Sequence, residues 1–332
     1  MSPRAIPCLV VALALSTSAL GQNVWTRASR PDEASAQRVH ERVEELFAME
    51  RDDKFGQGLV LERARGELER AIARDPNAIT LQFDLGIVES QLRRYPRAIE
   101  RLERALSAEP DHPMAARAWD ALGTAYAHVR RYEDEAHAYQ KYLALVRTDS
   151  SRAVTMMNLA ETKMYLGDLD SAIEGYREAN RLAVQAGSYS ASVISALCMW
   201  GLAVALDRSG DRGGARSTMT HALGLDPNAL FLKSESVFFV PDYERDWYLG
   251  LAALTKAMAA TSPSVQRDEW QRSFVHWDRY ISGALADKIP SLWVARAMSH
   301  RSVTIEAIKR IERSQLARKG TNDGKRPALP PQ

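Results

Sequence analysis

The strongest pattern along the chain is a pair of amphipathic stretches in residues 81–110, joined by a short polar turn near Arg93. Small and apolar side chains return at helical spacing on both sides of this turn. The positions that carry the pattern are Leu85, Gly86, Tyr95, Ala98, Leu102 and Ala105. Pro110 ends the second stretch, because proline lacks a backbone donor and clashes with the preceding helical turn. The spacing predicts a helical hairpin.

The same layout recurs three times downstream, so we expect a row of similar hairpins. The predicted units are residues 79–112, 116–150, 153–184 and 196–230. Each has a small residue on its first helix, which lets the two backbones approach closely; these residues are Gly86, Gly123, Ala160 and Ala203. One hairpin cannot bury its apolar face alone, so we expect neighbouring hairpins to stack.

The repeat has a recognisable period. Pro76 and Pro110 lie 34 positions apart. In the first and third units, a Leu-Gly or Leu-Ala pair on the first helix is followed by a second helix that carries an alanine, then an aromatic residue or leucine, and then another alanine. This arrangement resembles the tetratricopeptide repeat, a hairpin of two antiparallel helices. The resemblance covers residues 79–230. It implies an all-α fold, a right-handed superhelical solenoid of helix-turn-helix hairpins with a degenerate C-terminal unit.

The second unit departs from the family pattern at two positions. Glu135 stands at a small position between the helices, and Arg147 stands where proline is usual. Without that proline, we expect the second helix to be free to run on.

The flanking segments complete the expected organisation. Residues 1–21 form a signal peptide, and residues 22–78 hold N-terminal helices and a partial repeat. Residues 231–316 form a degenerate repeat with capping helices, interrupted by a short extended segment at 236–240. We expect the Pro-rich, polar tail at residues 317–332 to be disordered.

The N-terminus indicates export. Arg4 precedes an apolar run that begins at Cys8 and is too short to span a bilayer, and small residues lead up to Gly21. We expect cleavage after Gly21 and a periplasmic or secreted protein with no later membrane segment; an uncleaved anchor is the alternative. Cleavage would leave Cys198 as the only cysteine, and therefore no internal disulfide.

The net charge and the absence of complete motifs argue against nucleic-acid binding, a zinc protease site and a phosphate-binding loop. A formal net charge of +2 argues against a nucleic-acid partner. The stretch from His40 to Glu44 is similar to a metalloprotease helix but has glutamate where the second histidine is required. The Gly-rich stretch 210–214 lacks the Lys-Ser/Thr of a phosphate-binding loop. We therefore expect no catalytic residue, cofactor or metal site.

The resemblance instead implies a binding groove along the inward positions of the first helices. The residues of this sequence at those positions are Phe83, Ile87, Arg117, Asp120, Thr124, Met157, Asn158, Glu161, Trp200 and Val204. Their mixture of apolar and charged side chains suggests an amphipathic helix or extended peptide as the ligand. The alternative is that Phe83, Met157 and Trp200 simply fill gaps between helices.

The leading hypothesis is a non-catalytic adaptor that binds another protein or peptide. A second is an assembly factor of an envelope complex, contacting its partners through the aromatic C-terminal unit. A third, from a different class, is a ligand-binding protein or enzyme with a pocket near residues 237–242. Exposed groove residues would favour the first hypothesis, and a deep pocket with converging titratable groups would favour the third.

Overall fold

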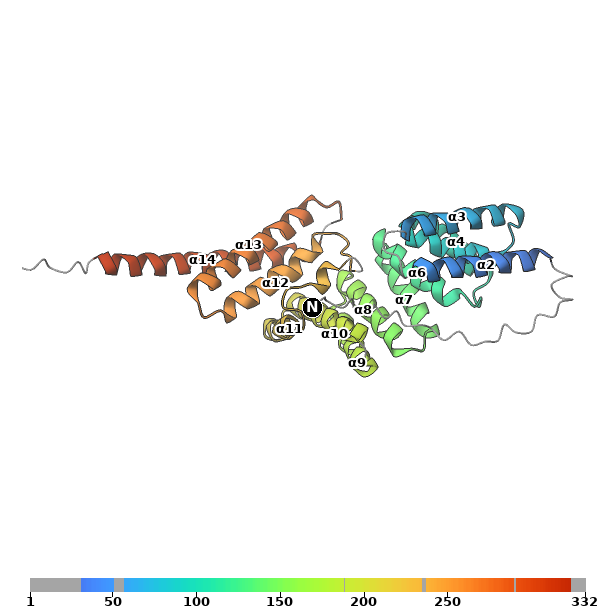
Figure 1. Cartoon of the computed structure of the whole chain (residues 1–332). Helices are drawn as coiled ribbons and strands as arrows, with labels where there is room; N and C mark the ends of the chain where they lie inside the picture. Colours follow the sequence, from blue (N-terminus) through green and yellow to red (C-terminus); the bar gives the residue numbers. More distant parts are fainter. Residues whose placement is uncertain (1–30, 51–56, 188, 235–236, 290, 324–332) are drawn as a thin grey trace, which may run out of the picture. The chain divides into compact units, whose positions relative to one another are not determined.

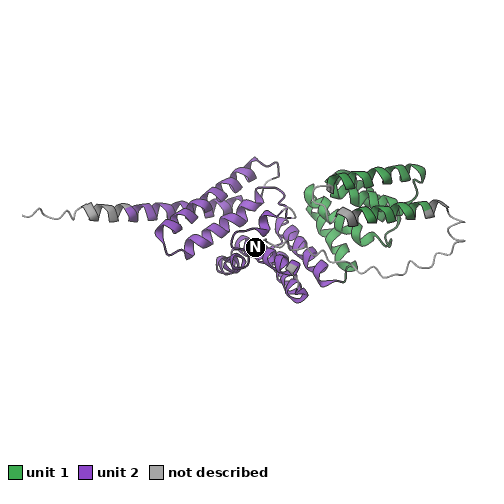
Figure 2. Ribbon diagram, viewed as in Figure 1, with its two compact units in different colours: residues 1–147 green, residues 148–332 purple. Residues whose placement is uncertain are grey.

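The computed structural model describes residues 31–50, 57–187, 189–234, 237–289 and 291–323, which are almost entirely helical (Figure 1). The described residues contain no strand, so the expected all-α class of helical hairpins is confirmed. The chain divides into two compact units, residues 1–147 and 148–332 (Figure 2). The division falls inside the block of four repeats expected at 79–230. The predicted signal peptide lies outside the described residues.

Unit 1 is a set of three consecutive hairpins. Its helices are α2 (Pro31–Glu50), α3 (Gln57–Arg74), α4 (Ile79–Gln91), α5 (Tyr95–Ala108), α6 (Ala115–His128) and α7 (Tyr132–Leu145). The first helices of the hairpins, α2, α4 and α6, pack side by side, with α4 contacting both of the others. This arrangement buries most of α4, whose residues from Phe83 to Ser90 are all buried.

Unit 2 continues the hairpin pattern and ends in a long helix. Its elements are α8 (Asp149–Tyr165), α9 (Leu169–Ala186), α10 (Tyr189–Ser209), α11 (Arg212–Leu225), the 3₁₀ turn η1 (Phe231–Lys233), α12 (Glu244–Ala259), α13 (Pro263–Ala286) and α14 (Val294–Asp323). Helix α10 packs against α8, α9, α11 and α12. By length and composition alone, α10 could cross a membrane, but most of its apolar stretch is buried inside unit 2, as in a core helix.

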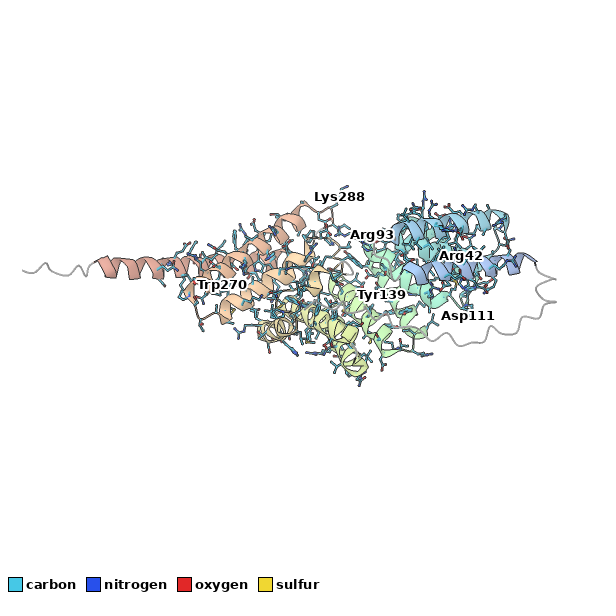
Figure 3. All side chains as sticks on the ribbon, in the orientation of Figure 1. Arg42, Arg93, Asp111, Tyr139, Trp270 and Lys288 are labelled. Carbon is cyan, nitrogen blue, oxygen red and sulfur yellow. The ribbon has the colours of Figure 1, made fainter. Side chains whose placement is uncertain are left out.

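In three of the predicted hairpins, the small residue expected on the first helix lies where the two helices cross. A Cβ added to Gly86 would stand 2.6 Å from Leu102, and one added to Gly123 would stand 2.3 Å from the ring of Tyr139, which Figure 3 labels. In the hairpin of α8 and α9, the Cβ of Ala160 packs against Gly175. Glycine and alanine at these crossings bring the backbones close enough for the large side chain opposite to fill the space between the helices.

The degenerate hairpin of α12 and α13 has the same kind of crossing. A Cβ on Gly250 of α12 would stand 3.0 Å from the indole of Trp277 on α13. Trp277 is fully buried. Helices α12 and α13 are therefore a hairpin of the same kind, lengthened by the extra turns at the start of α13.

Two turns between helices have the sequence Gly-Asp, in which the glycine allows the backbone conformation and the aspartate caps the next helix. Gly167 and Gly210 both have positive φ, a conformation that glycine adopts without steric cost. The aspartate that follows each glycine caps the next helix: Asp168 accepts a hydrogen bond from the backbone N–H of Ser171, and Asp211 accepts one from Gly214.

Three expectations about local structure are wrong. Helix α7 does not run on: it ends at Leu145 because Val146 is extended, even without proline at position 147. Residues 237–240 are irregular rather than part of a strand, and Ser236 lies outside the described residues. Helix α14 continues to Asp323, so it extends into the tail expected to be disordered; residues 324–332 lie outside the described part.

Candidate functional site

The inward face of α6 presents the exposed part of the predicted groove in unit 1. Arg117 and Asp120 are exposed, and Thr124 is partly buried one turn further along. The Arg117 guanidinium donates a hydrogen bond to Glu44 of α2 at 2.6 Å. The three side chains therefore form a polar strip along α6, tied at one end to α2.

Phe83 and Ile87 do not belong to an open groove, and their assignment as groove residues is corrected. Phe83 is 0% exposed and Ile87 is 5% exposed. The ring of Phe83 stacks on that of His112, with centroids 4.6 Å apart. Both lie on α4, which is covered by α2 on one side and α6 on the other, so their apolar side chains fill the space between helices.

The assignment of Trp200 and Val204 to the groove is corrected for the same reason. Both are 0% exposed and belong to the main apolar core of unit 2. Met157, Asn158 and Glu161 on α8 are partly buried, so they remain reachable from solvent. Six of the ten predicted residues thus stay accessible, three of them on α6 and three on α8.

Glu161 on α8 is a carboxyl group whose pKa is shifted by its surroundings. Its carboxylate accepts a hydrogen bond from the Tyr165 hydroxyl at 3.1 Å. Burial raises the pKa of Glu161 to about 7, although the hydrogen bond from Tyr165 opposes that shift. This carboxyl is therefore only partly ionised near neutral pH.

The aromatic residues of α12 and α13 form a core rather than a contact surface. Trp247, Trp277 and Tyr280 are each 0% exposed. Trp247 meets the other two edge-to-face, with centroids 5.3 and 4.9 Å away. These rings therefore pack against one another inside the hairpin of α12 and α13, in the edge-to-face arrangement that aromatic pairs favour.

A buried polar cluster lies against this aromatic core. Arg208 at the end of α10 pairs with Glu244 of α12, and both side chains are almost completely buried. The Glu244 carboxylate also accepts a hydrogen bond from the Tyr280 hydroxyl at 3.2 Å. The Arg208 guanidinium lies over the rings of Trp247 and Trp293, at 4.5 and 5.3 Å from their centroids.

Asp207 organises the other half of the cluster. Its carboxylate accepts a hydrogen bond from Trp247 Nε1 at 3.1 Å and lies 2.8 Å from Nε2 of His300 on α14. The titratable groups of this cluster are thus paired with one another, Arg208 with Glu244 and Asp207 with His300. The sequence does not predict this cluster, because no motif contains these residues. Charged residues such as Asp207 and Arg208 are common near the end of a helix.

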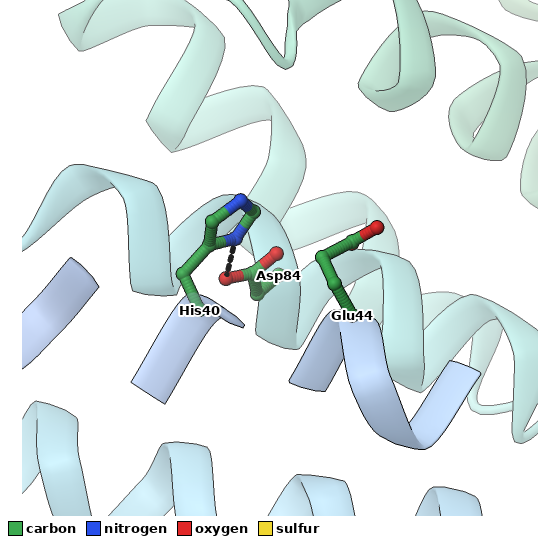
Figure 4. Close-up of side chains that lie close together, drawn as sticks. All are labelled: His40, Glu44 and Asp84. Atoms are coloured by element: carbon green, nitrogen blue, oxygen red, sulfur yellow. Dashed lines mark hydrogen bonds and ion pairs between the residues drawn. The ribbon is translucent and has the colours of Figure 1, made fainter. Parts of the chain in front are cut away.

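A second polar cluster, on α2 and α4, has the composition of a metal site (Figure 4). His40 and Glu44 project from α2 toward Asp84 of α4, and one ligand atom from each lies within 4.8 Å of the others. His40 Nδ1 is 2.8 Å from Asp84 Oδ2. The sequence alone does not show this cluster, because Asp84 is 40 positions beyond Glu44 and follows no known metal-ligand spacing.

Comparisons with known proteins bear on the hairpins of unit 1. Residues 83–150 match a family model described as a tetratricopeptide repeat. No curated protein matches the chain. Among solved structures, MamA 41-end from Desulfovibrio magneticus RS-1 is 17% identical with a TM-score of 0.45, over 59% of this chain and 96% of that one. A tetratricopeptide repeat protein from Parabacteroides merdae is 12% identical with a TM-score of 0.44, over 82% and 99%.

The family match spans α4, α5, α6 and α7, the hairpins in which Gly86 and Gly123 lie at the helix crossings. Sequence pattern, crossing geometry and family model agree on this segment. Residues 83–150 of the chain are therefore tetratricopeptide repeats.

Proposed function

We propose that this chain is a non-catalytic adaptor in the cell envelope, which binds a segment of another protein along the exposed face of α6. Tetratricopeptide repeats in general mediate protein–protein interaction. The observation that carries the proposal is the polar strip of Arg117, Asp120 and Thr124, which occupies inward repeat positions and remains accessible to solvent.

The composition of the strip favours an extended, polar ligand. The aromatic and aliphatic anchors that an amphipathic helix would need, Phe83 and Ile87, are buried in unit 1. Asp120 and Thr124 can accept or donate hydrogen bonds to a peptide backbone, and Arg117 can pair with a ligand carboxylate beside Glu44. We therefore propose an extended peptide segment rather than a helix.

The envelope location rests on the N-terminal pattern. Arg4, the apolar run that follows and the small residues before position 22 have the order of a cleavable export signal. The intact mass of the protein recovered from the source cells tests this part. A mature chain that begins at Gln22 supports export, and a full-length chain confined to the cytoplasm contradicts it.

The binding proposal is tested by capture of partners from envelope extract on immobilised protein, followed by mass spectrometry. Asp120→Lys and Thr124→Arg change the strip without touching a buried side chain, and each should lose the partner that the wild type retains. Glu133→Lys, at an exposed position on α7, is the matched control and should retain it. Equal capture by all four proteins would refute the assignment to α6.

A second candidate, an assembly factor that uses the C-terminal unit, is favoured by one feature. The exposed apolar side chains Leu285, Ile289 and Leu292 lie close together in sequence, from the last turn of α13 to the segment before α14, with exposures of 64%, 49% and 66%. Since the aromatic residues are buried, these aliphatic residues would make the contact. Loss of the captured partner on Leu292→Asp, with retention on Asp120→Lys, would favour this candidate over the first.

A further inference from the structure

We propose that His40, Glu44 and Asp84 form a binding site for a divalent first-row transition metal such as Zn²⁺. The site lies wholly within unit 1, where α2 packs against α4 (Figure 4). It borders the polar strip of α6 through the Arg117–Glu44 pair, but the proposal does not depend on the adaptor function.

The three residues converge because of their places on the two helices. His40 and Glu44 are four positions apart and therefore project from the same face of α2. Asp84 projects from the neighbouring face of α4, so that one ligand atom from each residue lies within 4.8 Å of the others. An imidazole nitrogen with two carboxylate oxygens is a ligand set suited to Zn²⁺ and its neighbours, with water completing the coordination.

Asp84 gives an independent reason to expect a cation. Its side chain is 0% exposed, and its Oδ1 atom has no hydrogen-bond donor among the described residues. A buried carboxylate oxygen without a partner is costly. The contact with His40 accounts for Oδ2 only, whereas a metal ion between the three side chains would also satisfy Oδ1.

The surroundings suit a metal-bound glutamate. Arg117 donates to Oε1 of Glu44 at 2.6 Å, which leaves Oε2 for the metal and holds the carboxylate in place. Hydrogen-bonded partners of this kind orient the ligands of known metal sites.

Only small movements are required of His40 and Asp84. Metal–ligand distances of about 2.0–2.2 Å in a tetrahedral site place two ligand atoms roughly 3.3 Å apart. His40 Nδ1 and Asp84 Oδ2 are 2.8 Å apart, so they need to separate slightly. Glu44 is partly exposed, and its contact with the exposed Arg117 can adjust as Oε2 turns toward the other two ligands.

The test is a calorimetric titration of the full chain with ZnCl₂, after chelator treatment and without a polyhistidine tag. The wild type should bind one equivalent at this site. His40→Gln and Asp84→Asn keep side chains of similar shape, and each should weaken that binding by more than about tenfold. His221→Gln, which alters an exposed histidine on α11, is the matched control and should leave it unchanged. Circular dichroism establishes that each variant is folded.

Co²⁺ provides a second readout that does not depend on affinity alone. The visible absorption of the Co²⁺-loaded protein should change when His40 is replaced, because an imidazole ligand is lost. The proposal is overturned if Zn²⁺ binding is absent, if folded His40→Gln binds as tightly as wild type, or if Ca²⁺ binds as tightly as Zn²⁺. The last result would mean that only the carboxylates are used.

Discussion

Replacement of Gly123 by alanine tests the packing principle on which the fold rests. Gly123 lies on α6 where it crosses α7, and a Cβ at this position would stand 2.3, 2.6 and 2.8 Å from three atoms of the Tyr139 ring. Ordinary carbon contacts are roughly 3.5–4.0 Å. Tyr139 is only 1% exposed, so its ring has no free space into which to turn.

The expected magnitude follows from two opposing effects. Alanine is more favourable than glycine inside a helix by about 0.8–1.0 kcal/mol. Overpacking a filled core costs about 1–3 kcal/mol. Gly123→Ala should therefore lower the free energy of unfolding by up to about 2 kcal/mol, despite its better helix propensity.

Gly66→Ala on α3 is the matched control in the same unit. A Cβ there would meet only the flexible end of Arg70, at 3.5 Å. This variant should raise stability by about 0.8–1.0 kcal/mol, so the difference between the two variants isolates the steric cost.

Urea unfolding followed by circular dichroism measures both free energies. Hydrogen exchange of peptides from α6 and α7 localises the effect, which is needed because two units need not unfold together. A Tyr139→Ala background should remove the penalty of Gly123→Ala. The reasoning is refuted if Gly123→Ala and Gly66→Ala stabilise the protein equally, or if removal of the Tyr139 ring leaves the penalty intact.

Three further predictions concern buried polar groups of unit 2. Arg208→Met should cost about 3–5 kcal/mol in urea unfolding, because Glu244 stays buried without its cation, and a second change, Glu244→Leu, should recover most of the loss. Burial raises the pKa of Glu161 in the folded protein to about 7, above its ordinary 4.5, so the folded state binds that proton more tightly. Its contribution to stability should therefore fall as pH rises between these values, and Glu161→Gln should flatten that part of the stability–pH curve. Burial also raises the pKa of the Cys198 thiol to about 12, so this thiol should resist a thiol reagent at pH 8 until urea is added; rapid native labelling would contradict its buried position.

The hairpins were predictable because their signal is local. Gly86 and Gly123 each precede the large side chain that they face by 16 positions, in Leu102 and Tyr139, so one period of sequence contains the whole crossing. Helix propensity, the turn residues and proline at position 110 point to the same hairpin. The break between the two units was not predictable, because the repeat pattern continues across Arg147 and Thr148.

The groove residues were harder to predict because exposure depends on neighbouring helices. Trp200 occupies an inward repeat position, yet α10 is apolar on every side, which is the mark of a helix buried all round. That signal was available in the sequence and argued against an open site. Asp84 also stands out, as a carboxylate between the apolar residues Phe83 and Leu85 of α4, but its proximity to His40 appears only once α2 and α4 are packed together.

The most direct test of the adaptor function is hydrogen exchange of the full chain with and without the captured partner. The account predicts that peptides from α6 containing Asp120 and Thr124 become protected when the partner binds, while peptides from α13 and α14 do not change. Protection confined to α13 and α14, with α6 unchanged, would contradict it.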